Sequence, residues 1–454
     1  MDRLLTEFRT NVKYHENAIN HAKEKGMKLN DLNVFFQPQS WEILSDMIAN
    51  GTYKTKPTRI CYIDKLNGNP LTYTQATERN MKDVREIYVM DLLDRVVWNM
   101  FYQICYNRFC HWIHPLCKSY KKGESTRTTA RELSKQLSNM ITYKGTKDDL
   151  SKYFDSVPIE IIDACLDEME KEEPSVIWKP IREFYHDNRV IINGEEVERF
   201  GSLKQGCAFA CLLADVILRD IDEAMSKRNV IYYRYSDDCI ILGQGSEPVK
   251  ARYELSKMLE AKGLKLNPKK TEYITHKTWF TFLGFRFKGN QITISKKTLK
   301  NITHKVKSET IFKCKQLHRP LTKRELMKAI DNIQYYFFTG CDKCNSGMAG
   351  YLFGACNVEH DIMEIDTFIK DCIRAAYTNK CLIYGLGSSY GKYGIVPHNK
   401  GTNVTMNRIK TTDDGDLVKE LGWYSLMHMY KKYHSGKGVY EAEKLKMQNG
   451  ICID

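Results

Sequence analysis

The sequence lacks any apolar run of about 18 residues or more, and it does not open with a cationic stretch followed by an apolar segment. A membrane-spanning helix needs roughly 20 consecutive apolar residues, and a secretory signal needs the cationic start. We therefore expect a cytoplasmic protein that does not associate with a membrane. No internal repeat is evident, and the 15 cysteines are odd in number and scattered, which predicts reduced thiols.

One group of cysteines has the spacing of metal ligands. Cys341 and Cys344 form a Cys-x-x-Cys pair, and Cys356 and His360 follow. Three thiolates and one imidazole could close a tetrahedral zinc site. However, the loop after Cys341 is short, and Cys356 lies among apolar residues, where a buried thiol is common. Zinc is therefore the less favoured interpretation.

The composition is that of a basic globular protein. At 454 residues and 42% apolar content, the chain has length for about three domains with real cores. Its 69 Lys and Arg against 56 Asp and Glu leave a net charge of +13, and 27 Tyr and 18 Phe can stack on bases. These features fit a nucleic-acid partner, although a merely soluble basic protein has the same charge balance.

Hydrophobic periodicity places the main helices and strands. Alternation predicts a strand at 84–90 and a hairpin from 59–63 and 71–74. Helical spacing of apolar residues predicts helices near 1–24, 91–104, 128–141, 159–171, 321–338 and 362–374, and a further apolar stretch spans 41–48.

The most informative stretch runs from Ile231 to Leu242. Asp237 and Asp238 lie between two apolar runs, each with the length and composition of a buried strand. This pattern predicts a hairpin with a charged tip. Burying uncompensated carboxylates is costly, so a metal cation is the expected partner. The alternative is an ordinary turn, in which Ser and Asp are favoured for local reasons.

A second acidic segment begins at Asp149. We expect an apolar and aromatic strand that starts at this carboxylate and ends at Asp155, followed by the helix at 159–171. If the strand brings Asp149 beside Asp237 and Asp238, the cluster could hold two hard cations through oxygen ligands. Two such ions stabilise the attacking and leaving oxygens of a phosphoryl transfer.

These blocks resemble the sequence motifs of reverse transcriptases, in the correct order. Residues 85–97 resemble the finger motif of group II intron and retron enzymes. The remaining blocks resemble motif A (Asp149–Asp155), motif B (Leu203–Cys207), motif C (Tyr235–Asp238), motif D (Gly263–Thr271) and the motif E primer grip (Phe280–Phe285). The resemblance is firm over about residues 59–290.

The resemblance implies an α+β fold of the right-hand polymerase type, with an antiparallel palm sheet and a helical thumb. The expected parts are an N-terminal helical extension (1–58), fingers (59–145), palm with interleaved finger elements (146–290), thumb (291–384) and a C-terminal appendage (385–454). A lysine-rich segment from Lys296 to Lys315 would lie along the primer and template, although it could equally be a solvated face.

The resemblance also assigns roles. Asp149 and Asp237 would bind two magnesium ions, for which manganese could substitute, with the Leu150 carbonyl contributing and Asp238 in support. Lys270, or its neighbour Lys269, would protonate the leaving pyrophosphate. Three roles are implied at the deoxynucleotide. Arg85, with Arg79 or Lys82, would bind the triphosphate, and Gln205 would contact the base. Phe154 would be the steric gate that excludes a ribose 2′-hydroxyl. Phe282, Leu283 and Gly284 would form the primer grip. Asp148 competes with Asp149, but only Asp149 has Phe154 and Asp155 in the register of the family.

The implied activity is that of an RNA-directed DNA polymerase, a nucleotidyltransferase that uses an RNA template, a DNA primer and deoxynucleoside triphosphates. Lys204, where many members have proline, and the Cys207–Ala210 continuation depart from intron and retron enzymes. With no nuclease, protease or ribonuclease H signature after residue 385, the chain looks more like the defence-associated, unknown-group reverse transcriptases of bacteria. Those copy a structured noncoding RNA in response to phage. Alternatives are a diversity-generating or retron-like enzyme, a catalytically idle RNA-binding protein and a nucleotidyl cyclase, and the oligomeric state is open.

Overall fold

The computed structural model of the chain describes residues 2–65, 68–79, 83–338, 347–378, 418 and 421–434. It divides into two compact units, one formed by residues 1–124 and 144–273, the other by residues 125–143 and 274–454. Residues 59–124 of the expected fingers and 146–273 of the expected palm lie in the first unit, together with the N-terminal helices, whereas residues 125–143 and 274–290 lie in the second. Within the described ranges, no helix has both the length and the apolarity to cross a membrane.

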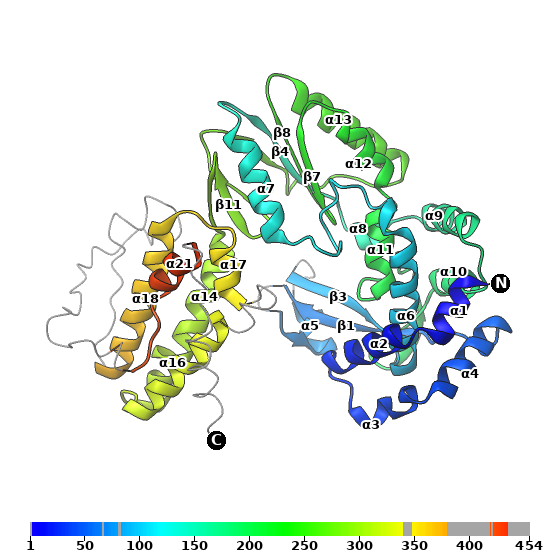
Figure 1. The fold of residues 1–454 in the computed structure, drawn as a ribbon, viewed down its shortest axis with the longest axis horizontal. Coiled ribbons are helices and arrows are strands. Elements are labelled where there is room, and N and C mark those ends of the chain that lie inside the picture. The colour runs from blue at the N-terminus through cyan, green and yellow to red at the C-terminus, as the bar shows by residue number, and fades with distance from the viewer. Residues whose placement is uncertain are drawn as a thin grey trace. The chain divides into compact units, whose positions relative to one another are not determined.

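The N-terminal part of the first unit is helical (Figure 1). Its elements are α1 (Arg3–Thr10), α2 (Val12–Glu24), α3 (Leu29–Leu32), η1 (Asn33–Phe36) and α4 (Pro38–Ala49). A single helix was expected over residues 1–24, but the chain breaks at Asn11, whose side chain accepts a hydrogen bond from the backbone of Tyr14 and caps α2. An asparagine side chain competes with the helical backbone in this way.

A mixed sheet follows, with strand order β2-β1-β5-β6 and β3 on β1. β1 pairs antiparallel with β2 and β3 and parallel with β5. The strand at 84–90 and the first strand of the hairpin are confirmed, whereas residues 73 and 74 belong to a helix. The bounds are β1 (Thr58–Asp64), β2 (Pro70–Leu71), α5 (Tyr73–Glu78), β3 (Val84–Val89), β5 (Arg189–Ile192) and β6 (Glu195–Glu198).

Helix α6 (Leu92–Phe109) is the centre of the first unit's main core. Asp91 caps its first turn, and its residues are buried on most sides, because α1, α2 and α11 (Ala208–Val216) all pack on it. Trp98 lies in an aromatic cluster with Phe184 and Phe209. Further helices are η3 (Cys110–Trp112), α8 (Tyr153–Ser156), α9 (Ile159–Glu172) and α10 (Trp178–His186).

A second sheet of this unit has the strand order β7-β8-β4-β9. β8 pairs antiparallel with both β7 and β4. Helices α12 and α13 pack together and cover this sheet (Figure 1). The bounds are β4 (Lys144–Asp149), β7 (Ile231–Tyr235), β8 (Asp238–Gly243), β9 (Glu272–Thr275), α12 (Arg219–Ser226) and α13 (Glu247–Ala261).

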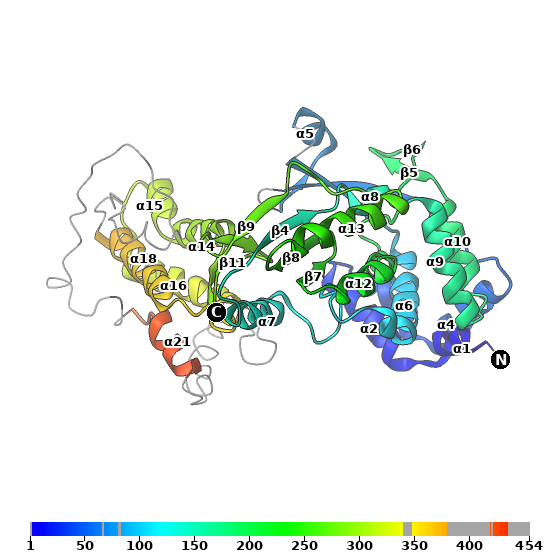
Figure 2. The same ribbon diagram turned by 90° about the horizontal axis from the view of Figure 1, so that it is seen from above.

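The second unit combines a small antiparallel sheet, β10-β11-β12, with a group of helices (Figure 2). Its elements are α7 (Thr126–Ser138), β10 (Phe280–Phe282), β11 (Phe285–Lys288), β12 (Gln291–Ile294), α14 (Lys296–Glu309), α15 (Ile311–Leu317), α16 (Lys323–Phe338), α17 (Gly347–Phe353), α18 (Glu359–Thr378) and α21 (Leu426–His434). Helix α7, expected among the fingers, belongs here because it packs on β12, with Ser134 Oγ donating to the carbonyl of Asn290 (3.0 Å).

The described end of the chain is anchored by one carboxylate. Asp366 on α18 accepts from Trp423 Nε1 (3.2 Å), Ser425 Oγ (2.7 Å) and the backbone N–H of Leu426 (2.8 Å), which fixes the start of α21. Of the candidate zinc ligands, Cys341 and Cys344 lie outside the described residues. Cys356 is buried, and His360 pairs with Glu364.

Candidate functional site

The Tyr235–Asp238 segment forms a tight β-hairpin. Strand β7 ends at Tyr235 and β8 begins at Asp238, and these two residues are paired across the hairpin. The turn is therefore made by Ser236 and Asp237. Ser236 has a φ of +58°, a left-handed conformation that non-glycine residues rarely adopt. The expected hairpin with a charged tip is confirmed.

Strand β4 brings Asp149 to this hairpin. Asp149 lies directly opposite Asp238 in the antiparallel register of β4 and β8. The backbone N–H of Leu150 donates to the carbonyl of Asp237 (2.8 Å), so the turn itself is tied to the end of β4. The expected strand from Asp149 to Asp155 is wrong, because the strand ends at Asp149 and the chain turns into α8. Three carboxylates nevertheless meet at this edge of the sheet.

The segment after Leu264 runs beside the end of β4 and delivers a lysine. Ser151 N–H donates to the carbonyl of Lys265, and Asn267 N–H donates to that of Asp149 (2.8 and 2.7 Å). Lys270 Nζ then lies 2.8 Å from both carboxylate oxygens of Asp149. The lysine side chain is 59% exposed, so this is an ion pair at the surface of the site.

Asp148 has a different environment from its neighbour. It is fully buried and accepts from the Arg252 guanidinium (2.9 Å), from Thr146 Oγ1 (2.7 Å) and from Thr271 Oγ1 (2.8 Å). Its carboxylate oxygens are thus satisfied within the fold. Because Thr271 follows Lys270 directly, the same bonds help to hold Lys270 in place.

The three clustered carboxylates repel one another. Burial, reinforced by the charges of Asp238 and Asp149, raises the pKa of Asp237 to about 6. Burial also raises the pKa of Asp238, and Asp149 adds to that shift, while Lys147 opposes it. A cation held by all three would relieve this repulsion.

The donor set suits a hard divalent cation, since carboxylate oxygens are the ligands that Mg²⁺ prefers. In the part of the chain that the structure describes, no group of three or more His, Cys, Asp or Glu side chains is arranged around a metal position. Both oxygens of Asp149 are instead engaged by Lys270. The residues fit a metal ion by their chemistry and by the repulsion among them.

Backbone hydrogen bonds join Phe154 to the loop that precedes Gln205, and join Gln205 to β3. The carbonyl of Phe154 accepts from Leu203 N–H (3.1 Å), and the carbonyl of Gln205 accepts from Tyr88 N–H of β3 (2.7 Å). The Phe154 ring is half-buried against Tyr153. Gly206 has a φ of +118°, and a Cβ there would lie 2.6 Å from the carbonyl oxygen of Tyr88. Glycine is therefore required for this close approach.

Lys204 holds the loop before Gln205 from within the core. Its side chain is buried, and its ammonium donates to the carbonyls of Phe184 (2.5 Å) and Asp187 (2.7 Å). It also lies over the Phe184 ring, 4.1 Å from the centroid. Burial lowers the pKa of Lys204 to about 8. The residue that departs from the family pattern is thus a structural support of this loop.

The expected triphosphate cations differ in their surroundings. Arg85 on β3 is exposed and makes no ion pair or side-chain hydrogen bond with the described residues. Arg79 is paired with the buried carboxylate of Asp64 (2.5 Å). Lys82 lies outside the described residues. Arg85 is therefore the better placed of these side chains to meet an anion.

The expected primer grip is a hairpin tip of the second unit. Phe282 pairs with Phe285, which leaves Leu283 and Gly284 as a two-residue turn with φ values of +51° and +80°. Positive φ at both central positions is typical of a type I′ turn. Tyr351 Oη donates to the carbonyl of Leu283 (3.2 Å), and a Cβ on Gly284 would lie 2.4 Å from that hydroxyl oxygen.

Two functional supports were missed at the level of sequence. Arg252 partners Asp148, and Arg234, inside β7, is buried behind the Tyr235–Asp238 hairpin. The signal for Arg234 was present, since a lone arginine in an apolar strand must find a buried partner. The partner itself, on α12, could not be read from the sequence.

Comparison with known proteins gives a family match over the residues of this site. Residues 67–287 match the model of the family described as reverse transcriptase (RNA-dependent DNA polymerase). This range includes Asp149, Asp237 and Asp238, and the α+β architecture with antiparallel sheets is that of a right-hand polymerase. The match supports a reverse transcriptase, a class that uses divalent metal ions and binds nucleic acid. It does not distinguish among the groups of these enzymes.

Among solved structures, the chain is similar to apo telomerase from Candida tropicalis. A form truncated from its C-terminal domain is 15% identical, with a TM-score of 0.39, over 57% of this chain and 60% of that chain. A second apo telomerase structure is 12% identical, with a TM-score of 0.42, over 72% of this chain and 62% of that chain. The chain thus spans about three fifths of the length of these telomerases. No curated protein matches the sequence.

Proposed function

We propose that this protein synthesises DNA on an RNA template, and that the template is a cognate structured noncoding RNA copied in anti-phage defence. The observation that carries the catalytic part is the register of β4 and β8, which places Asp149 opposite Asp238 with Asp237 in the adjoining turn. The reverse transcriptase match over the same residues supports the choice of reaction.

Asp149 and Asp237 would hold two Mg²⁺ ions, with the Leu150 carbonyl contributing and Asp238 in support. When bound, the ions would stabilise charge on the attacking 3′-oxygen and on the leaving pyrophosphate. Lys270 carries a proton at Nζ beside Asp149, where it can be donated to the leaving group. The carboxylates must be ionised to serve as ligands, so metal binding competes with proton binding at Asp237, whose pKa is raised by burial.

The surrounding side chains would bind and select the nucleotide. Arg85 offers an exposed guanidinium to the triphosphate, whereas Arg79 must first leave Asp64. Phe154, fixed through its own carbonyl, would exclude a ribose 2′-hydroxyl, which selects deoxynucleotides. Gln205 follows the buried Lys204 anchor and would contact the base pair.

The second unit offers groups for the primer and template. The exposed lysines on α14 and α15, which are Lys296, Lys297, Lys300 and Lys315, would contact the phosphate backbone, whereas Lys305 and Lys313 are paired with Glu309. The Leu283–Gly284 turn would hold the primer end. The assignment to phage defence rests on the sequence departures at Lys204 and Cys207–Ala210. A diversity-generating or retron-like enzyme is the competing biological role.

Primer extension tests the catalytic proposal. Purified protein is incubated with a DNA-primed RNA template, labelled deoxynucleotides and Mg²⁺ or Mn²⁺, with EDTA as the blank. The Asp237→Ala/Asp238→Ala variant should lose extension and keep its affinity for RNA, because phosphate contacts elsewhere supply most of that affinity. The matched control is Asp167→Ala/Asp220→Ala, which removes two exposed aspartates and should extend normally.

Extension by the Asp237→Ala/Asp238→Ala variant would refute the active-site assignment. RNA binding without extension by the wild-type protein in either cation would favour the catalytically idle alternative. The biological role is tested separately, by sequencing the RNA and DNA that copurify with the protein. A single structured RNA with complementary DNA is expected, and a random sample of cellular RNA would contradict the cognate-template proposal.

A further inference from the structure

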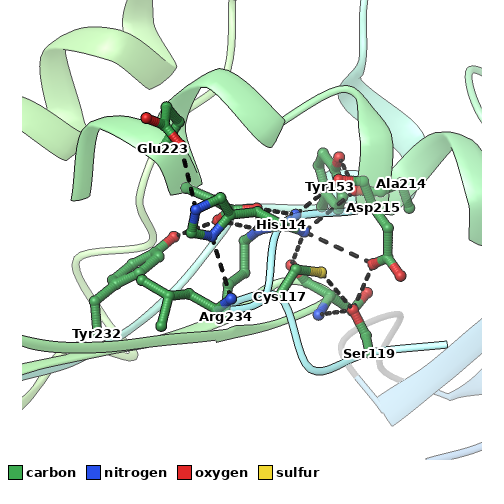
Figure 3. A network of polar contacts seen from close by, with 12 residues as sticks. His114, Cys117, Ser119, Tyr153, Ala214, Asp215, Glu223, Tyr232 and Arg234 are labelled. Carbon is green, nitrogen blue, oxygen red and sulfur yellow. Dashed lines mark hydrogen bonds and ion pairs between the residues drawn. The ribbon is translucent and has the colours of Figure 1, made fainter. Parts of the chain in front are cut away.

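Behind the catalytic hairpin lies a buried polar network that the roles assigned above do not use (Figure 3). Its centre is Arg234 on β7, whose side chain is 1% exposed. The guanidinium donates to both carboxylate oxygens of Asp222 on α12, through Nη2 at 2.6 Å and Nε at 2.9 Å to separate oxygens. It also donates to the backbone carbonyls of Ala214 (3.2 Å) and Asp215 (2.8 Å) on α11. One arginine thus joins the strand that enters the turn to two helices.

A second group of bonds reaches the turn itself through Ser119. The Ser119 hydroxyl donates to the Asp215 carboxylate (2.5 Å) and accepts from the backbone N–H of Ser236 (2.9 Å). Ser119 is fully buried, and its segment is joined to β7 because Lys118 N–H donates to the carbonyl of Arg234 (2.8 Å). Ser119, Asp215, Asp222 and Arg234 are called the turn-support network below.

The hydrogen bonds of the turn-support network converge on the backbone of Ser236. Ser236 is in the left-handed region, and such a residue persists only where its surroundings impose the conformation. Its N–H is bound by Ser119, its carbonyl accepts from Arg234 at 3.4 Å, and the next carbonyl, that of Asp237, accepts from Leu150. The direction in which the Asp237 side chain leaves the turn is therefore set by these contacts.

We propose that Ser119 is a positioning residue for DNA synthesis, which holds the Ser236–Asp237 turn through its bridge to Asp215, with Arg234 and Asp222 as the buried anchor. The proposal rests on the proposed function and deepens it. Ser119 touches neither nucleotide nor primer in this assignment, and it acts through the position of Asp237. Ser119 is the residue of the network to substitute in a test. Removing Arg234 would leave the buried Asp222 carboxylate without its cation and would destabilise the fold.

The test is single-nucleotide incorporation on a primed RNA template, measured by rapid quench with wild type, Ser119→Ala, Ser119→Thr and Ser119→Cys. The amplitude of the burst reports the folded, active fraction, and its rate constant reports the chemical step. A displaced carboxylate should lower the rate constant of Ser119→Ala about tenfold or more, with amplitude and nucleotide affinity kept. Ser119→Thr retains a hydroxyl and should restore most of the rate. The thiol of Ser119→Cys is a weaker donor and acceptor and should give an intermediate rate.

The matched control is Ser45→Ala, which removes a buried serine hydroxyl on α4, remote in the chain from the site residues, and should keep the wild-type rate constant. A Ser119→Ala protein with reduced amplitude and an unchanged rate constant would show a role in stability alone and overturn the proposal. So would an unchanged rate and amplitude. If Ser119→Ala does not fold, the test is whether the rate constant decreases in the order wild type, Ser119→Thr, Ser119→Cys. Equal rate constants for the three proteins would overturn the proposal. Absence of any incorporation by wild type would instead contradict the proposed function.

Discussion

The buried carboxylates at the hairpin, Asp149, Asp237 and Asp238, are expected to lower the free energy of unfolding at neutral pH. The pKa of Asp237 is raised from 3.8 to about 6 by burial and by Asp238 and Asp149. Since the folded-state pKa lies above the unfolded one, the folded state binds more protons between pH 4 and 6 and loses stability as pH rises through that window. At pH 7 the penalty for the ionised carboxylate amounts to up to about 3 kcal/mol. At pH 4 it falls to about 0.5 kcal/mol.

Asp237→Asn removes the charge and keeps the shape. We expect the variant to be more stable than wild type by about 2 to 3 kcal/mol at pH 7 in EDTA, to be nearly equal to it at pH 4, and to make no DNA. The free energy of unfolding is measured by urea titration, followed by circular dichroism at both pH values. Asp46→Asn, at a 63% exposed side chain, serves as the control and should match wild type.

Added Mg²⁺ provides a second readout of the same reasoning. An ion that binds the folded site stabilises wild type according to its affinity and should stabilise Asp237→Asn much less. The reasoning is refuted if Asp237→Asn is no more stable than wild type at pH 7, or if its advantage is the same at pH 4. Either outcome would mean that burial and the neighbouring carboxylates do not disfavour the ionised form of Asp237 in the folded protein.

Three further perturbations test other parts of the site. Phe154→Ala should admit ribonucleotides, measured as the ratio of kcat/KM for deoxynucleotides and ribonucleotides, and an unchanged ratio would place the gate elsewhere. Arg85→Ala should raise the KM for deoxynucleotides about tenfold or more, and Arg79→Ala less, because a charge-assisted bond to phosphate contributes roughly 1.5–3 kcal/mol. Lys204 has its pKa lowered from 10.5 to about 8, so the unfolded state holds more protons between those values and stability from this group rises with pH. Relative to Lys204→Met, wild type should gain about 2 kcal/mol in urea unfolding between pH 7 and 9.5, and a constant difference would contradict the buried charge.

The elements that could be predicted from the sequence are those with a strong hydrophobic pattern. The hairpin around Asp237 and Asp238 is one, because two apolar runs flank a short polar turn. Helices α9 and α16 are others, and both lie within a few residues of the expected bounds. In each of these segments, the pattern of apolar residues within the segment itself predicts which side chains are buried.

Strand β4 could not be predicted in the same way. Its sequence, Lys144 to Asp149, is polar throughout, yet it pairs with β8 in the interior of a sheet. The polar side chains are tolerated because distant residues satisfy them, most clearly Asp148 with Arg252. The hydrophobic pattern therefore predicted a strand after Asp149, where the apolar residues lie. In the structure the strand that pairs with β8 ends at Asp149.

The second limit concerns partners that are remote in sequence. Ser119 and Arg234 are separated by more than a hundred residues, and neither belongs to a recognisable motif. Their importance appears only when the fold brings Asp215 and Asp222 to them. The carboxylates of the site could be named from the sequence, but the groups that hold them in place could not.

The contact between Gly206 and Tyr88 has a consequence for how this site can change. The strand that carries Arg85 and the loop that carries Gln205 share one backbone hydrogen bond, at a point with no room for a side chain. A substitution that shifts either segment must displace the other, so variation at the two positions should be strongly epistatic. Libraries that aim to alter nucleotide selection should therefore vary the two segments jointly and keep the glycine fixed.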